Sequence, residues 1–431
     1  MSDGPRGARL VVEPGHDVPL VWIRVAALGG SAADPAGHEG LMRHAALLSR
    51  RGAGDLDRAA LDDAVDGLGA SLHVDTTRDA ITVSGLCLAR NADALVALMA
   101  DVMANPRMDE PEHEKLLRET GALLDELRDD DSSIADRFFV REVAPGHPYA
   151  RTSIGTGASL ERIDLAEVRR AHAAALVPGN LIIGLAGAVD AAAAESLAER
   201  LVAGLPEAPA PALPALPDVA PATARRLCLI DKPERVQSQI RIGHPAPAYA
   251  HPDFAALSCA ETIFGGTFSA RLMQEIRAKR GWSYGAGCSL GRSRGASWLR
   301  IALAPAAAVT PDAAALTLAL FEQLCEGGVT ADELAFARSH MMGSMPFLSA
   351  TPAQRMRLAV RNLGYGLPAD YHERLRTNVA GLSLDRVNQA IRLHFRPQAT
   401  VSVIVATAAS MATRLERLDL GAASKFPYDS Y

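Results

Sequence analysis

Residues 205–223 constrain the architecture of this chain more than any other segment. They read LPEAPAPALPALPDVAPAT, in which proline recurs every two to four positions. Proline lacks a backbone N–H and has a fixed φ, so neither an α-helix nor a β-ladder can persist through such a segment. We therefore predict a linker at 205–223 between an N-terminal domain at 1–204 and a C-terminal domain at 224–431. A chain of 431 residues is long enough for two or more domains.

The two parts on either side of this linker show the same order of hydrophobic patterns, which indicates an internal repeat. Apolar runs typical of strands alternate with segments of helical periodicity. The expected class is α+β, with helices packed on mostly antiparallel sheets in two homologous α/β-sandwich domains. The predicted strands are 20–28, 71–74, 80–87, 180–187, 237–243, 284–290, 297–304 and 400–406, and the predicted helices are 40–50, 59–68, 91–104, 112–128, 165–175, 252–264, 268–280, 311–326, 330–345 and 384–394.

Charge and cysteine content exclude several classes of protein. A net charge of -6 provides no broad positive field for a phosphate backbone or an anionic bilayer, so neither nucleic acid nor a membrane is an expected partner. The five cysteines are scattered without any C-x-x-C spacing, which fits neither a disulfide framework nor a zinc knuckle. No stretch reaches the roughly 18 uncharged apolar residues of a membrane span, and the N-terminus has no signal-like apolar core. The expected location is cytoplasmic, or periplasmic if a leader was removed.

Histidines occur near the first predicted helix, in PAGHEGLMRHAALLSRRG. A zinc-peptidase helix carries two histidines four positions apart, with a glutamate beside one of them to act on the metal-bound water. Here His38 and Glu39 are followed by Met42 where the second histidine would stand, and His44 has no histidine four positions away on either side. Neither H-E-x-x-H nor H-x-x-E-H is present, so His38 and His44 are interpreted as structural or surface histidines.

The most informative segment is FGGTFSARLMQEIRAKRGWSYGAGCSLG, residues 264–291. Phe268, Leu272 and Ile276 form an apolar stripe at helical spacing, and Gly281 supplies a helix stop. Arg277 near the end of this helix and Tyr284 at the start of the next strand would then lie on adjoining elements, and their side chains could converge. The alternative from the residues alone is a surface arginine beside a half-buried aromatic ring.

At this point the sequence resembles the pitrilysin and mitochondrial-processing-peptidase family of inverted-motif zinc peptidases. The matching stretches are LGGSAADPAGHEGLMRHAALLSRRG, GASLHVDTTRDAITVSG, PGHPYARTSIGTGASLERID, VPGNLIIGLAGAVD and GGTFSARLMQEIRAKRGWSYG, and together they cover nearly the whole chain. The resemblance implies two homologous α+β domains that form half of a peptidase clamshell. Two such chains, or one double-length chain, would close around an unfolded peptide.

The zinc motif of that family is degenerate in this sequence. Its first histidine falls on Arg43, its glutamate on Ala46 and its second histidine on Leu47. The third family ligand, a glutamate on a later helix, falls on Glu126, with neighbouring Asp125 as an alternative alignment. One carboxylate cannot hold zinc, so the resemblance implies that this chain carries no metal and no other cofactor, and that Glu126 is a solvated helix residue.

The second half of the family's site is retained, because Arg277 and Tyr284 stand seven positions apart in the matching context. In two-chain bacterial members one subunit bears the zinc and its partner bears this pair. The resemblance therefore implies a non-catalytic, site-completing subunit of a heterodimeric zinc endopeptidase that processes short or unfolded peptides. Two other hypotheses are a structural scaffold, as in the respiratory-complex core subunits, and a peptide-binding homodimer or holdase. The sequence does not select a substrate peptide.

Overall fold

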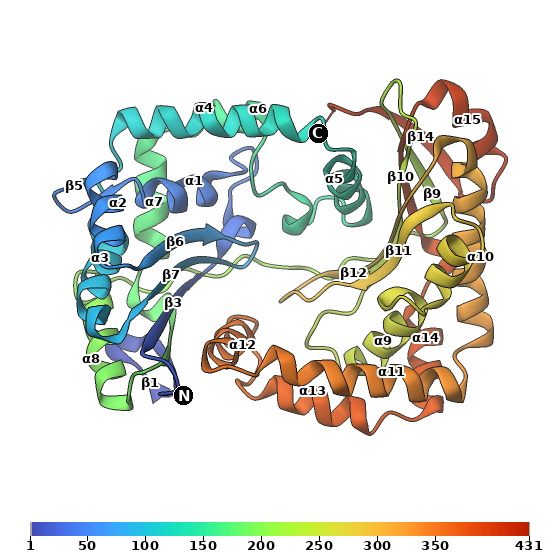
Figure 1. Ribbon diagram of the computed structural model, residues 1–431. Coiled ribbons are helices and arrows are strands. Elements are labelled where there is room, and N and C mark those ends of the chain that lie inside the picture. Colours follow the sequence, from blue (N-terminus) through green and yellow to red (C-terminus); the bar gives the residue numbers. More distant parts are fainter. Residues whose placement is uncertain (1, 431) are drawn as a thin grey trace. The chain divides into compact units, whose positions relative to one another are not determined.

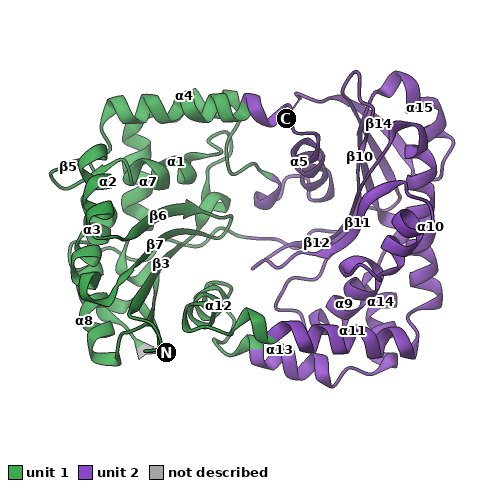
Figure 2. Ribbon diagram, viewed as in Figure 1, with its two compact units in different colours: residues 1–124, 151–215, 346–372 green, residues 125–150, 216–345, 373–431 purple. Residues whose placement is uncertain are grey.

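The computed structural model describes residues 2–430, which form two compact units (Figures 1 and 2). Unit 1 comprises the described residues of Met1–Leu124, Arg151–Ala215 and Pro346–His372, and unit 2 comprises Asp125–Ala150, Leu216–Met345 and Glu373–Tyr431. Each unit is built on one six-stranded sheet.

The sheet of unit 1 has the strand order β1-β2-β8-β3-β7-β6. Strand β2 pairs with β8 in parallel, whereas β3 is antiparallel to both β8 and β7, and β6 is antiparallel to β7. Every residue of β8 is buried, as expected for a strand in the middle of a sheet that is covered on both faces. The strands are β1 (Ser2–Asp3), β2 (Arg9–Pro14), β3 (Leu20–Leu28), β6 (Ser71–Thr76), β7 (Ala80–Leu88) and β8 (Leu181–Gly187).

The sheet of unit 2 repeats this arrangement in the order β11-β12-β10-β13-β9-β14. Its β9 and β13 are parallel, β10 is antiparallel to β13 and to β12, and β11 is the antiparallel edge strand. The order of the strands and the directions of the five that correspond to β2, β8, β3, β7 and β6 are shared, whereas β14 is parallel to β9 and β1 is antiparallel to β2. This shared arrangement confirms the α+β class and the internal repeat. The strands are β9 (Arg226–Asp231), β10 (Gln239–Ala246), β11 (Ser283–Leu290), β12 (Ser297–Pro305), β13 (Val401–Ala406) and β14 (Ala422–Pro427).

Helices cover both sheets and bury their apolar stripes against them. In unit 1 one face of the sheet shares a buried apolar core with α2, α3 and α8. None of the helices in the described part of the chain has the length and apolar content that a membrane crossing requires. The main helices are α1 (Leu41–Ser49), α2 (Arg58–Gly67), α3 (Ala92–Ala104), α4 (Glu110–Leu127), α7 (Leu165–Ala175), α8 (Ala191–Val202), α9 (Phe254–Glu261), α10 (Thr310–Gly327), α11 (Ala331–Ser344), α13 (Tyr371–Ala380), α14 (Leu384–His394) and α15 (Ala408–Glu416).

The second face of each sheet is covered by a helix from the opposite half of the sequence (Figure 2). In unit 1 this helix is α12 (Pro352–Gly364), whose apolar residues pack on β2, β3 and β8. It approaches β8 closely, because a Cβ at Gly184 would lie 2.4 Å from the sulfur of Met356. In unit 2 it is α5 (Asp131–Val143), whose buried Phe138 and Phe139 belong to a core shared with β9 and β13.

These exchanged helices make the compact units differ from the two sequence halves. The ranges 1–204 and 224–431 describe the two copies of the repeat. Residues 125–150 come from the first copy but belong to unit 2, and residues 346–372 come from the second copy but belong to unit 1. The physical reason is burial of apolar surface. The apolar stripe of α12 is buried against the sheet of unit 1, and that of α5 is buried against the sheet of unit 2. The sequence patterns also did not predict α5, α12 or strand β9.

The core of unit 2 contains a neutral histidine. His244 on β10 is fully buried and its ring stacks on Phe321 of α10, with 5.8 Å between ring centroids. Its Nδ1 lies 2.7 Å from the Pro245 carbonyl oxygen, so Nδ1 must be the donor, and its Nε2 accepts the Arg396 N–H at 3.2 Å. Burial lowers the pKa of His244 to about 4.

This histidine is expected to make unit 2 sensitive to acid. Its pKa is lower in the folded state than the ordinary value of 6.5, so its stabilising contribution is present above pH 6.5 and is lost as the pH falls towards 4. His244→Gln removes this titration and should lose less thermal stability than the wild type between pH 7 and pH 4.5. The matched control is His73→Gln, at an exposed histidine, which should follow the wild-type profile. Parallel pH profiles for wild type and His244→Gln would contradict the prediction.

Candidate functional site

Unit 2 contains a cavity of about 740 Å³ between one face of its sheet and the segment that precedes β11. Strands β10, β11 and β12 form its floor, and two π-helical turns, η6 (Thr262–Gly266) and η7 (Met273–Ala278), contribute to its wall. Arg277 and Tyr284 both line this cavity. The structure therefore brings together the two residues that the sequence singled out.

Arg277 lies between two exposed aromatic rings. Its guanidinium carbon is 4.7 Å from the ring centroid of Tyr284 and 5.7 Å from that of Phe268. Such cation–π contacts hold an arginine in place without neutralising it. Among the described residues, no carboxylate lies within ion-pair distance of Arg277, and the side chain of Tyr284 is 86% exposed. A full positive charge and a phenol thus remain available to a ligand.

Phe268 corrects one detail of the sequence analysis. It was expected to belong to a buried helical stripe with Leu272 and Ile276, which are indeed fully buried. Phe268 itself is 79% exposed, because it lies outside the helical turns, in the link between η6 and η7. Its ring forms part of the cavity wall beside Arg277 instead of part of the core.

Both site residues stand on irregular backbone. Arg277 belongs to η7, where the Lys279 N–H bonds to the Gln274 carbonyl five residues earlier, as in a π-turn. Tyr284 lies where the register of β11 on β12 shifts, between Ser283 and Ala286. π-Bulges and β-bulges often occur at functional sites because they change the direction in which a side chain points. The sequence predicted regular elements at these positions.

Three further residues maintain this irregular geometry, and sequence reasoning missed them. The buried hydroxyl of Ser283 donates to the Gly285 carbonyl at 2.6 Å and accepts the Ala304 N–H at 3.0 Å, which fastens the bulge. The sulfur of Met273 lies 3.3 Å from the Ala286 nitrogen and accepts its N–H. Gly265 lets η6 approach the strand, since a Cβ there would lie 2.3 Å from the Cys288 nitrogen. These roles depend on which segments lie next to one another in the folded chain, and the sequence pattern does not specify that.

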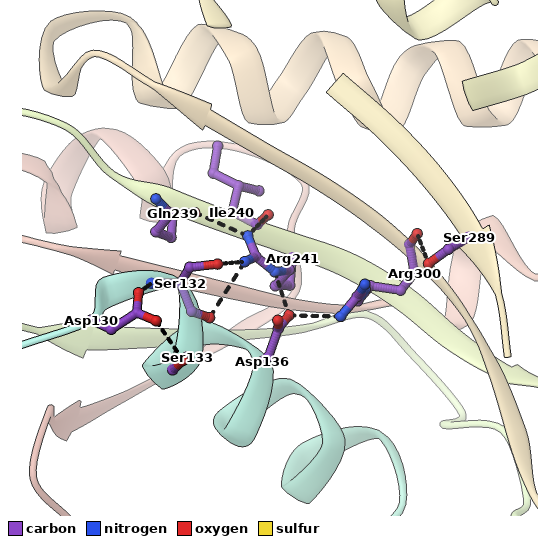
Figure 3. A network of polar contacts seen from close by, with 9 residues as sticks. All are labelled: Asp130, Ser132, Ser133, Asp136, Gln239, Ile240, Arg241, Ser289 and Arg300. Carbon is purple, nitrogen blue, oxygen red and sulfur yellow. Dashed lines mark hydrogen bonds and ion pairs between the residues drawn. The ribbon is translucent and has the colours of Figure 1, made fainter. Parts of the chain in front are cut away.

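Two polar residues that line the cavity, Gln239 and Arg241, belong to a network of polar contacts (Figure 3). Arg241 on β10 donates to Asp136 of α5 at 2.6 Å, and Arg300 on β12 donates to the same carboxylate oxygen at 2.9 Å. Arg241 also bonds to Ser132 of α5 and to Gln239. The exchanged helix α5 is thereby joined to the strands that carry the cavity floor.

The positions of the degenerate zinc motif lie on α1 in unit 1. Ala46 is fully buried in the core, and Arg43 and Leu47 are half-buried. Burial lowers the pKa of Arg43 from its ordinary value. A guanidinium and two aliphatic side chains offer no zinc ligand, so these residues do not fit the metal that the family's motif binds.

The other residues near that motif have structural contacts or face solvent. His44 is buried and its Nε2 lies 2.9 Å from Nδ1 of His113, and burial lowers the pKa of His44 to about 3. His38 lies 2.9 Å from Glu167. Glu126 is exposed in the last turn of α4, and its neighbour Asp125 pairs with Arg128.

Unit 2 contains one group of residues with the composition of a metal site among those described. One ligand atom from each of His251, Asp253 and His394 lies within 4.8 Å of the others. The Asp253 carboxylate already binds Arg386 and His394, and Nδ1 of His251 accepts the Asp253 N–H at 3.0 Å. The arginine thus supplies the positive charge that a metal would supply, and the group is explained as a hydrogen-bonded cluster between α9 and α14.

The chain is similar in sequence to several known proteins. Residues 162–341 match the family profile described as the Peptidase M16 inactive domain. A Helicobacter pylori protein named non-peptidase homolog YmxG is 22% identical over 386 residues, which cover 89% of this chain and 88% of that protein. A Mycobacterium tuberculosis protein named an uncharacterized zinc protease is 26% identical over 347 residues, covering 78% of this chain and 77% of its own length.

Solved structures share the fold over almost the whole chain. The M16 inactive domain from Pseudomonas fluorescens superimposes with a TM-score of 0.88 at 24% identity, covering 94% of this chain and 96% of that structure. The first half of a periplasmic protease from Escherichia coli superimposes with a TM-score of 0.77 at 14% identity, covering 96% of this chain and 92% of that half. Together with the repeated fold, these matches show that the chain is similar to the M16 inactive domain over residues 162–341 and has the fold of M16 peptidase-like proteins over almost its whole length.

Proposed function

We propose that this chain is the site-completing subunit of a heterodimeric zinc endopeptidase that processes short or unfolded peptides. The observation that carries the proposal is the pair Arg277 and Tyr284, which line one cavity with an unneutralised cation and an accessible phenol. The zinc is assigned to a homologous partner subunit, because Arg43, Ala46 and Leu47 cannot bind it. The heterodimer would act in the cytoplasm, or in the periplasm if the chain is exported.

The chemistry of peptide hydrolysis explains what the pair would contribute. Hydrolysis passes through a tetrahedral oxyanion, and donors fixed at the position where its charge develops lower the barrier. The Tyr284 hydroxyl is a suitable donor, and the Arg277 guanidinium can hold a neighbouring carbonyl of the substrate. The rings of Phe268 and Tyr284 hold Arg277, and the Ser283 hydroxyl stabilises the bulge at Tyr284, before substrate binds. The two side chains therefore need little further ordering when substrate binds.

The exposure of the site favours a role in a complex over a scaffold role. Large aromatic side chains that remain exposed beside a cavity are typical of binding surfaces. Phe268 and Tyr284 are both more than three-quarters exposed. A scaffold or a peptide-binding subunit without a role in proteolysis would not need a phenol and a free guanidinium at this interval.

The test is reconstitution with a zinc-bearing homologue from the same genome. Alone, the chain is expected to hold no stoichiometric zinc and to leave a quenched fluorescent peptide uncleaved, because the motif positions lack ligands. Mixing at micromolar concentration should produce a one-to-one complex and chelator-sensitive cleavage. Elemental analysis, sedimentation and fluorescence measure the three properties. One tightly bound zinc per isolated chain, or a self-dimer that excludes the homologue, would contradict the proposal.

A further inference from the structure

Two glutamine side chains in the cavity have orientations that their neighbours dictate. Gln239 is the first residue of β10, Gln237 stands two positions before it, and both line the cavity. The amide of Gln237 lies 3.0 Å from the Ala304 carbonyl oxygen, which can only accept, so Gln237 donates its N–H and its own oxygen is left over. The amide of Gln239 lies 3.2 Å from the Arg241 guanidinium, which can only donate, so Gln239 accepts there and its NH₂ group is left over.

Arg241 acts as the positioning residue for Gln239. Its Nε binds Asp136, its Nη1 binds Gln239 and the Ile240 carbonyl, and its Nη2 binds the hydroxyl and the carbonyl of Ser132 (Figure 3). A guanidinium has five N–H donors, and all of them are used within the protein. Arg241 therefore has no donor left for a ligand, and its contribution is to fix which atom of Gln239 is free.

The shape of the cavity suits a main chain. On β11 and β12 the floor includes four residues with small side chains, which allow a ligand backbone to come close to the sheet. At the edge strand β11 the Ala286 N–H is already bound by the sulfur of Met273, so this donor is not free to pair with an added strand. On the face of the sheet, where the two glutamines lie in the cavity, side chains and not strand backbone would pair with a ligand. The small floor residues are Gly285, Gly287, Ala302 and Ala304.

We infer that Gln237 and Gln239 recognise the main chain of an extended peptide, Gln239 donating to a peptide carbonyl and Gln237 accepting a peptide N–H. An extended peptide presents both groups on the same side, and the two glutamines present the complementary acceptor and donor two positions apart along the chain. The inference rests on the proposed function, since the cavity is assigned to a peptide. It adds the element of recognition that is independent of the peptide's side chains.

The first test exchanges a donor for an acceptor at one atom. Gln239→Glu keeps the bond to Arg241 and replaces the free NH₂ group by an oxygen. The probe is a fluorescein-labelled dodecapeptide of alternating serine and alanine with one central phenylalanine, and its affinity is measured by fluorescence anisotropy on the intact chain and on the reconstituted pair. Gln239→Glu should weaken binding about tenfold. Gln323→Glu, which adds the same charge at an exposed position of α10, should leave the affinity unchanged.

The second test identifies the peptide N–H that Gln237 accepts. A series of the same dodecapeptide, with one backbone amide methylated in each member, removes one N–H at a time. One position should weaken binding of the wild type about fivefold to tenfold, and this loss should vanish in Gln237→Met, which has no acceptor. Thermal melting confirms that Gln237→Met and Gln239→Glu remain folded.

The outcomes separate this inference from the proposed function. No saturable binding to chain or pair, unchanged affinity of Gln239→Glu, or the same methylation profile in wild type and Gln237→Met would each overturn the inference. If Tyr284→Phe still abolishes turnover in that case, the proposed function survives without it. If the methylation profile is as expected but Tyr284→Phe has no effect, the cavity binds peptides without taking part in proteolysis.

Discussion

Replacing Tyr284 by phenylalanine is expected to lower kcat of the reconstituted pair by about a hundredfold or more. The change removes one hydroxyl donor and almost no volume, and the ring that contacts Arg277 is kept. Because the side chain is exposed, neither folding nor assembly should change. Steady-state kinetics on a quenched peptide measure the loss. Tyr428→Phe is the matched control, since that tyrosine is in unit 2 but does not line the cavity, and it should retain full activity.

Arg277 provides a companion variant that separates binding from catalysis. If its guanidinium holds a carbonyl of the bound substrate, Arg277→Ala should raise KM at least as much as it lowers kcat. Arg277→Lys keeps the charge but lacks the planar fork, so it should restore only part of the loss. Activity within about threefold of wild type for both Tyr284→Phe and Arg277→Ala would mean that the pair is a structural remnant.

Replacing Phe139 by alanine is expected to destabilise unit 2 by about 3–5 kcal/mol, because a fully buried aromatic ring would leave a cavity between α5 and the sheet. Urea unfolding measures the change, and a Trp22→Phe background leaves only the two tryptophans of unit 2 as reporters. The matched control is Phe336→Ala on α11, where the ring is half exposed and the loss should stay below about 1 kcal/mol. Equal losses for both variants would show that α5 is not part of the unit 2 core.

Several features of the fold could be predicted from the sequence because they depend on local patterns. Strand β3 occupies the predicted residues 20–28, and α1, α3 and α14 begin and end within a residue or two of the predicted bounds. Alternation of apolar residues and helical periodicity depend only on neighbours in the chain, so the repeat and the α+β class followed from them. The interval between Arg277 and Tyr284 is likewise a property of the sequence alone.

The tertiary structure decided which face each element covers and how the site is held. The amphipathic pattern of α12 specifies an apolar stripe, but not that this stripe covers the sheet of the first repeat, because burial depends on residues about 170 positions or more away, such as Ile182. The bulge at Tyr284 and the π-turn at Arg277 depend on bonds from Ser283, Met273 and Ala304, which come from different elements. Contacts with Ala304 and Arg241 likewise determine which amide atoms of Gln237 and Gln239 remain unpaired. Residue identity determined which groups are present in the chain, and long-range packing determined which of them remain unpaired and accessible.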